Sequence, residues 1–103
     1  MSRTILKSCV DSDGRMRHYL LPIESPAAFN DLLVFVQKEY QLHVEERIDG
    51  PDTVSCRLAG SEGAIMFVLG DMTGAQIFAD KPSDASFAQR IALGAEERIR
   101  QVL

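Results

Sequence analysis

The hydrophobic and polar positions of this chain follow two periods, and the period changes along the sequence. Residues 42–48 and 54–58 alternate apolar and polar side chains, which is typical of half-buried strands. Residues 64–69 are apolar at every position, which predicts a central strand buried on both faces. Residues 75–79 form a last short apolar run. Turn residues separate the four segments, so we expect a β-meander over residues 42–80.

Two helices are predicted on either side of this meander. The first has Ser25 as N-cap and Pro26 at its first position, and Val34 and Phe35 widen its apolar stripe, so we expect deep burial. The second begins near residue 83 and runs to the C-terminus, and Gly94 should let it pack closely on the sheet. The stripe of the first helix consists of Phe29, Leu32, Leu33, Val36 and Tyr40.

An N-terminal hairpin completes the predicted fold. Residues 4–10 and 16–21 are strand-like, and the Asp-Ser-Asp-Gly sequence between them favours a turn. The order of elements is therefore β-β-α-β-β-β-β-α over a single domain, residues 1–103. This order predicts an α+β fold, a mostly antiparallel six-stranded sheet with two helices packed on one face. The hairpin can extend either edge of this sheet.

The composition is that of a soluble globular protein, 46% hydrophobic and 25% charged. No apolar run is long enough to cross a membrane, and the N-terminus lacks the apolar core of a signal peptide. We therefore expect a cytoplasmic protein without a membrane partner. In that compartment Cys9 and Cys56 are expected to be buried thiols rather than a disulfide.

Negative charge is concentrated in the middle of the chain. The net charge is −4, and residues 24–86 hold eleven of the fifteen carboxylates but only four of the eleven basic residues. A nucleic-acid partner would require a basic stripe, so that class is excluded. The acidic middle favours a cationic protein partner, or it serves solubility alone.

Nothing in the sequence is specific for catalysis, a metal or a cofactor, so we predict a protein that is not an enzyme. His18 and His43 lie in different predicted strands, without further ligands at a metal-binding spacing. The alternative function is a small-ligand binder or enzyme with a pocket between sheet and helices. It would require His18, His43 and Glu46 to converge on one cleft.

Glu46 breaks the pattern of its strand. Alternation places it on the same face as Leu42, Val44 and Ile48, which should be the core face. Three explanations are open. The charge points inward to protect an edge strand, a bulge turns it outward, or it is a functional acid or ion-pair partner.

The last two strands carry more large apolar residues than two helices can cover. Which side of these strands faces the helices is open. If one side does, the side chains left on the free face are Ile65, Phe67, Leu69 and Phe78; if the other side does, they are Met66, Val68 and Ile77. Soluble monomers rarely expose such a group. The N-terminal hairpin folding across, a second copy of the chain or another protein should cover it.

These observations favour a small acidic protein-binding module that uses its free sheet face to form a homodimer or to hold a partner. A bacterial immunity protein or a secretion chaperone would suit this profile by analogy, since either could neutralise or mask a cationic target. A structural homodimer within a larger assembly is a further hypothesis. The predicted contact residues are the carboxylates Glu45, Glu46, Asp49 and Asp52 and the apolar side chains Ile65, Phe67 and Phe78.

Overall fold

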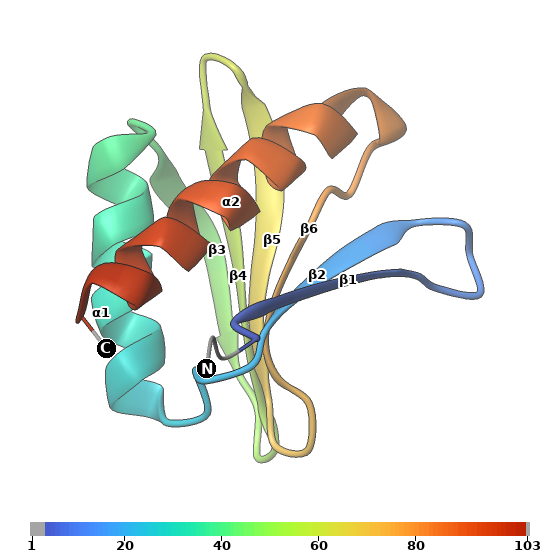
Figure 1. The fold of residues 1–103 in the computed structure, drawn as a ribbon. Helices are drawn as coiled ribbons and strands as arrows, with labels where there is room; N and C mark the ends of the chain where they lie inside the picture. Colours follow the sequence, from blue (N-terminus) through green and yellow to red (C-terminus); the bar gives the residue numbers. More distant parts are fainter. Residues whose placement is uncertain (1–3, 103) are drawn as a thin grey trace.

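The computed structural model describes residues 4–102 and has the predicted order of elements (Figure 1). Two helices, a short 3₁₀ turn at Pro82–Asp84 and six strands make up the fold. The helices are α1 (Pro26–Glu39) and α2 (Ala85–Val102). The strands are β1 (Leu6–Val10), β2 (Met16–Leu20), β3 (His43–Asp49), β4 (Thr53–Gly60), β5 (Gly63–Gly70) and β6 (Gly74–Phe78).

The six strands form one antiparallel sheet in the order β1-β2-β6-β5-β4-β3. The predicted α+β class and six-stranded sheet are confirmed. The N-terminal hairpin joins the sheet beside β6, so it extends the sheet and does not fold across the free face. Strands β1 and β3 are consequently the two edges.

Helix α1 begins as its sequence predicts. The Ser25 side-chain oxygen accepts a hydrogen bond from the Ala28 backbone N–H at 3.2 Å, and Pro26 is the first helical residue. Its buried face is narrower than we expected, because Val34 is 54% exposed. Phe35 is half-buried, and the guanidinium of Arg98 lies 5.3 Å from its ring centre.

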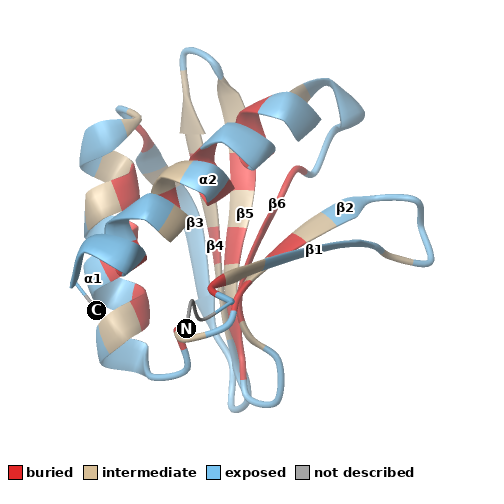
Figure 2. Cartoon of the chain, viewed as in Figure 1, coloured by how far each residue is buried: buried red, intermediate tan, exposed pale blue. Residues whose placement is uncertain are grey.

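The core lies between the helices and one face of the sheet, where β5 and β6 are most deeply buried (Figure 2). The ring of Phe67 on β5 stacks on Phe29 of α1, with 4.4 Å between their centres. Both side chains are excluded from solvent. This contact fixes which side of β5 faces the helices, because successive side chains of a strand point to opposite faces.

Gly94 serves a different contact from the one we predicted. It lies where α2 passes the end of α1, and a side chain at this position would overlap the Tyr40 hydroxyl. That hydroxyl also lies 3.5 Å from the Arg90 carbonyl oxygen, to which it donates a hydrogen bond. The missing side chain therefore allows close helix–helix contact, not close contact with the sheet. Within residues 4–102, neither helix is apolar and long enough to span a bilayer.

Candidate functional site: the open face of the sheet

The face of the sheet turned away from the helices, here called the open face, carries two rows that cross all six strands and a shorter third row, His43, Ala59 and Ala64. Directly paired residues of neighbouring strands share a face, so the register defines each row. The first row, from β1 to β3, is Cys9, Arg17, Phe78, Met66, Arg57 and Glu46. The second row is Lys7, Tyr19, Gln76, Val68, Ser55 and Ile48.

This register corrects the predicted apolar contact residues. Ile65 and Phe67 are completely buried on the helix side of β5, so they are core residues and do not lie on the open face. Ile77 also faces the core. Phe78 does belong to the open face, but it is only 8% exposed. The accessible apolar side chains there are Ile48, which is 57% exposed, and the half-buried Tyr19, Met66 and Val68.

A bulge at the start of β3 explains Glu46. The pairing with β4 shifts between Val44 and Glu46, so Glu45 is an extra residue in the edge strand. Past the bulge Glu46 pairs with Arg57 and shares the open face with it, where it is exposed. Of the three explanations, the outward-turning bulge is confirmed.

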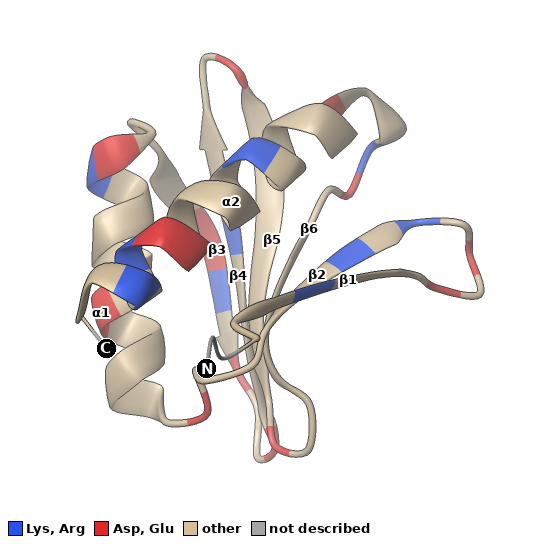
Figure 3. Cartoon of the chain, viewed as in Figure 1, with Lys and Arg blue, Asp and Glu red and all other residues tan. Residues whose placement is uncertain are grey.

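The four predicted acidic contacts do not form one patch. Glu45 and Glu46 lie beside the open face. Asp49, past the bulge, bonds Arg47 of its own strand at 3.2 Å, and Asp52 lies in the β3–β4 turn. Asp52 lines a surface hollow together with the carboxylates Glu24 and Asp71. Asp52 and Asp71 therefore lie at the end of the sheet that holds the β3–β4 and β5–β6 turns, where Figure 3 shows acidic segments.

A chain of ion pairs crosses the open face beside the first row. The Arg57 guanidinium donates to Asp80 at 2.9 Å and to Glu45 at 3.3 Å. Asp80 lies 3.6 Å from Arg15, which precedes β2. The hydrogen bond with Asp80, and then that with Glu45, raise the pKa of Arg57 because they stabilise its charged form. These ion pairs join β3 and β4 to the segments before β2 and after β6, and their two positive and two negative charges balance.

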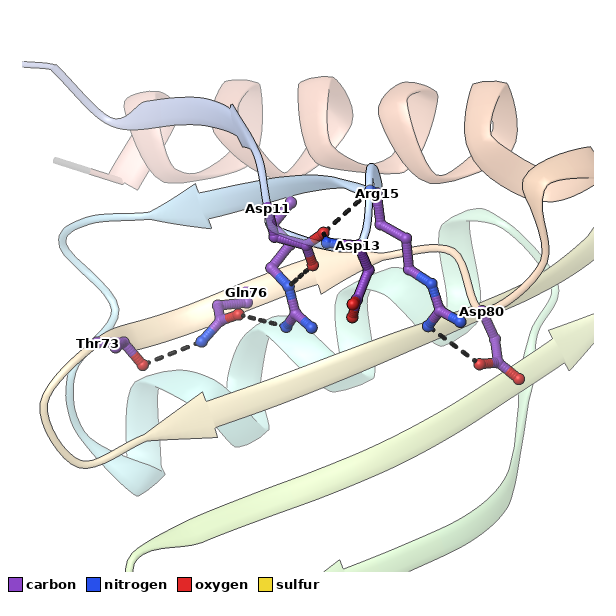
Figure 4. A network of polar contacts seen from close by, with 7 residues as sticks. Asp11, Asp13, Arg15, Thr73, Gln76 and Asp80 are labelled. Atoms are coloured by element: carbon purple, nitrogen blue, oxygen red, sulfur yellow. Dashed lines mark hydrogen bonds and ion pairs between the residues drawn. The ribbon is translucent and has the colours of Figure 1, made fainter.

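Arg17 organises a second polar network (Figure 4). Its Nε donates to Asp11 Oδ2 at 2.7 Å, and its Nη1 donates to Gln76 Oε1 at 3.1 Å. Gln76 in turn donates to the Thr73 hydroxyl at 3.0 Å. The guanidinium also lies 4.2 Å from the centre of the Phe78 ring, which it covers. The hydrogen bond from Arg17, and then that from the Arg15 backbone N–H, lower the pKa of Asp11 because they stabilise its carboxylate.

The three residues required for the small-ligand alternative do not converge. His18 is buried on the helix side of β2, where its Nδ1 lies 2.7 Å from the Ser8 hydroxyl. His43 and Glu46 are both exposed on the open face, on the edge strand β3, so the sheet separates them from His18. Across the described part of the chain, no three or more His, Cys, Asp or Glu side chains are placed to hold a metal ion.

Burial of His18 predicts a loss of stability in acid. Its pKa is lowered from 6.5 by desolvation, so the unfolded chain binds the proton more tightly than the folded one. The free energy of unfolding should therefore fall as the pH drops below 6.5, by at most about 1.4 kcal/mol per pH unit. Urea denaturation at several pH values measures this slope.

Two variants test whether His18 is the source of this pH dependence. His18→Gln should reduce it, whereas His43→Gln, which changes an exposed histidine, should leave it as in the wild type. An equal slope in the wild type and both variants would mean that His18 is not its source.

The two cysteines lie on opposite faces of the sheet. Cys56 is fully buried on β4, and this burial raises the pKa of its thiol. Cys9 is exposed in the first row of the open face. The expectation of buried thiols is therefore correct for Cys56 and wrong for Cys9.

Comparison with known protein families, characterised proteins and solved structures finds no match to this chain. Its function is therefore argued from its own surface. The residues that give the open face its character and were not among the predicted contacts are Arg17, Tyr19, Arg57, Met66 and Val68. Alternation along their strands could have found Arg17, Tyr19 and Arg57, whereas Met66 and Val68 were one of two possible phases of an apolar strand.

Proposed function

We propose that this chain is a small protein-binding module whose contact surface is the open face of the sheet. The observation that supports this most directly is an apolar group on a sheet face that neither helix covers: Tyr19, Ile48, Met66 and Val68. Of these four, Ile48 is exposed and the other three are half-buried. Accessible apolar side chains gathered on one face are typical of an interaction site.

The composition of the open face supports the same proposal. Tyrosine, methionine and arginine are enriched in protein interfaces, and this face carries Tyr19, Met66, Arg17 and Arg57. The arginines are held in place by hydrogen bonds before any partner arrives. Ordered side chains lose less conformational entropy on binding, which favours association.

The acidic contribution to binding is smaller than the sequence suggested. Glu46 is the carboxylate in the rows of the open face, and Glu45 is already bonded to Arg57. A cationic partner would meet these two residues at the β3 edge, while Asp49 and Asp52 would lie outside the contact. A cytoplasmic location and a role like that of an immunity protein or a chaperone remain part of the proposal.

Affinity capture from the native cell extract tests the proposal when three baits are compared. Val68→Asp places a charge in the open face, and Leu93→Asp places one on α2, where Leu93 is 51% exposed. We expect the wild type and Leu93→Asp to retain the same protein, and Val68→Asp to lose it. Retention by all three baits would show that the open face is not the contact surface.

A further inference from the structure

The charges of the open face indicate which partner fits it. We propose that the partner is a second copy of this chain, stacked face to face about a twofold axis parallel to the strands. This inference rests on the proposed function, since it names the occupant of the same surface. The two sheets would face each other about 10 Å apart, with the helices outside, as in aligned sheet packing.

The internal charge balance of the open face favours a second copy over a strongly cationic protein. Both arginines of the first row are already bonded, Arg17 to Asp11 and Arg57 to Asp80 and Glu45. A surface whose charges are paired within itself has little net field to attract an opposite charge. A twofold axis between β6 and β5 brings Arg17 of one copy over Arg57 of the other, and the carboxylates bonded to each arginine offset the repulsion between them.

Two charged residues of the rows, Lys7 and Glu46, take part in none of the ion pairs seen within residues 4–102. Lys7 lies on β1 and Glu46 on β3, the two edges of the sheet. Five strand spacings separate these edges, about 24 Å, so the two side chains do not interact within one copy.

A twofold axis parallel to the strands brings these opposite charges together. An axis between β6 and β5 places β1 of one copy over β3 of the other, so that Lys7 approaches Glu46 of the second copy. The symmetry produces this contact twice. The residues lie in adjacent rows, about 7 Å apart along the strands and about 10 Å apart between the sheets, so their backbones are about 12 Å apart. Extended lysine and glutamate side chains together span this distance. The other in-plane axis, perpendicular to the strands, would instead place like edges and like charges together.

The size of the open face is sufficient for such a contact. Its width of about 24 Å and strand lengths of about 20 Å give about 500 Å² in each copy, or about 1,000 Å² in the pair. Specific protein interfaces begin near this size. We therefore expect a reversible dimer whose population depends on protein concentration.

Sedimentation equilibrium of charge-reversed variants tests this arrangement. The wild type should approach twice its chain mass of 11.4 kDa as its concentration is raised from micromolar to millimolar. Lys7→Glu and Glu46→Lys should each weaken the dimer about tenfold, because each removes both intermolecular pairs and adds repulsion. The double variant should return to within about threefold of the wild type. Only a contact between copies predicts this rescue, since the residues are too far apart within one chain.

Two further variants control for folding and for other surfaces. Val68→Asp, at a half-buried position near the centre of the second row, should weaken the dimer at least about a hundredfold and retain the circular dichroism of the wild type. Val34→Asp, on the outer side of α1, should change nothing. A dimer that survives Val68→Asp, or a double variant no better than the singles, would overturn the proposed arrangement.

The outcome also separates this inference from the proposed function. A wild type that stays at 11.4 kDa at every concentration overturns the second-copy inference. If Val68→Asp nevertheless loses a captured protein, the open face is still a contact surface and its partner is a different protein. If capture is unaffected by Val68→Asp as well, both proposals fail.

Discussion

Replacing Phe67 with alanine should lower the free energy of unfolding by about 3–5 kcal/mol, the usual cost of removing a buried phenylalanine. Its ring is fully buried and stacks on Phe29 at 4.4 Å, so the substitution leaves a cavity between β5 and α1. Urea denaturation of the purified variant measures the loss.

The neighbouring substitution Met66→Ala is the matched control. Met66 is half-buried on the open face, so its removal leaves no enclosed cavity and should cost about 1 kcal/mol or less. It should instead weaken binding through the open face. The opposite ranking, with Met66→Ala the more destabilising change, would mean that the faces of β5 have been assigned the wrong way round.

Replacing Arg17 with alanine should cost about 1–3 kcal/mol, because it deprives the buried Gln76 side chain of a donor and uncovers the Phe78 ring. The thermal unfolding midpoint and urea denaturation both report this change. Loss of the guanidinium should also raise the pKa of Asp11 toward its ordinary value, since the hydrogen bond from Arg17 is the main reason that it is low.

Arg17→Met separates the two effects of this substitution. Its side chain still covers Phe78 but donates no hydrogen bond, so it should recover part of the stability that Arg17→Ala loses. The pKa of Asp11, followed by NMR, should rise equally in both variants. A pKa that stays low in Arg17→Met would contradict the role that we assign to the hydrogen bond.

The order of elements could be predicted from sequence because each element carries its own local signal. Ser25 and Pro26 mark the start of α1, and the turn residues separate the strands. The phase of β5 could not be predicted, because a strand that is apolar at every position satisfies alternation in both phases. Only its pairing with β4 and β6 and the stacking of Phe29 on Phe67 decide it.

The details of the candidate site depend on contacts that no local pattern encodes. The bulge at Glu45 adds one residue to β3 and changes the face of every side chain that follows, which alternation alone assigns wrongly. The pairs of Asp80 with Arg15 and Arg57 join residues far apart in the chain. The outward positions of Arg17 and Arg57 follow from alternation, but their bonded partners do not.

The alkylation rate of Cys9 tests most directly whether the open face is a contact surface. Cys9 is exposed in the first row, and the buried Cys56 is an internal control in the same molecule. We predict that Cys9 reacts more slowly as the protein concentration is raised, that Val68→Asp abolishes this slowing, and that Cys56 stays unreactive. If the alkylation rate of Cys9 is the same at every concentration and the same in Val68→Asp, a second copy does not cover this face. If a captured partner protein also leaves the alkylation rate unchanged, the open face is not a contact surface.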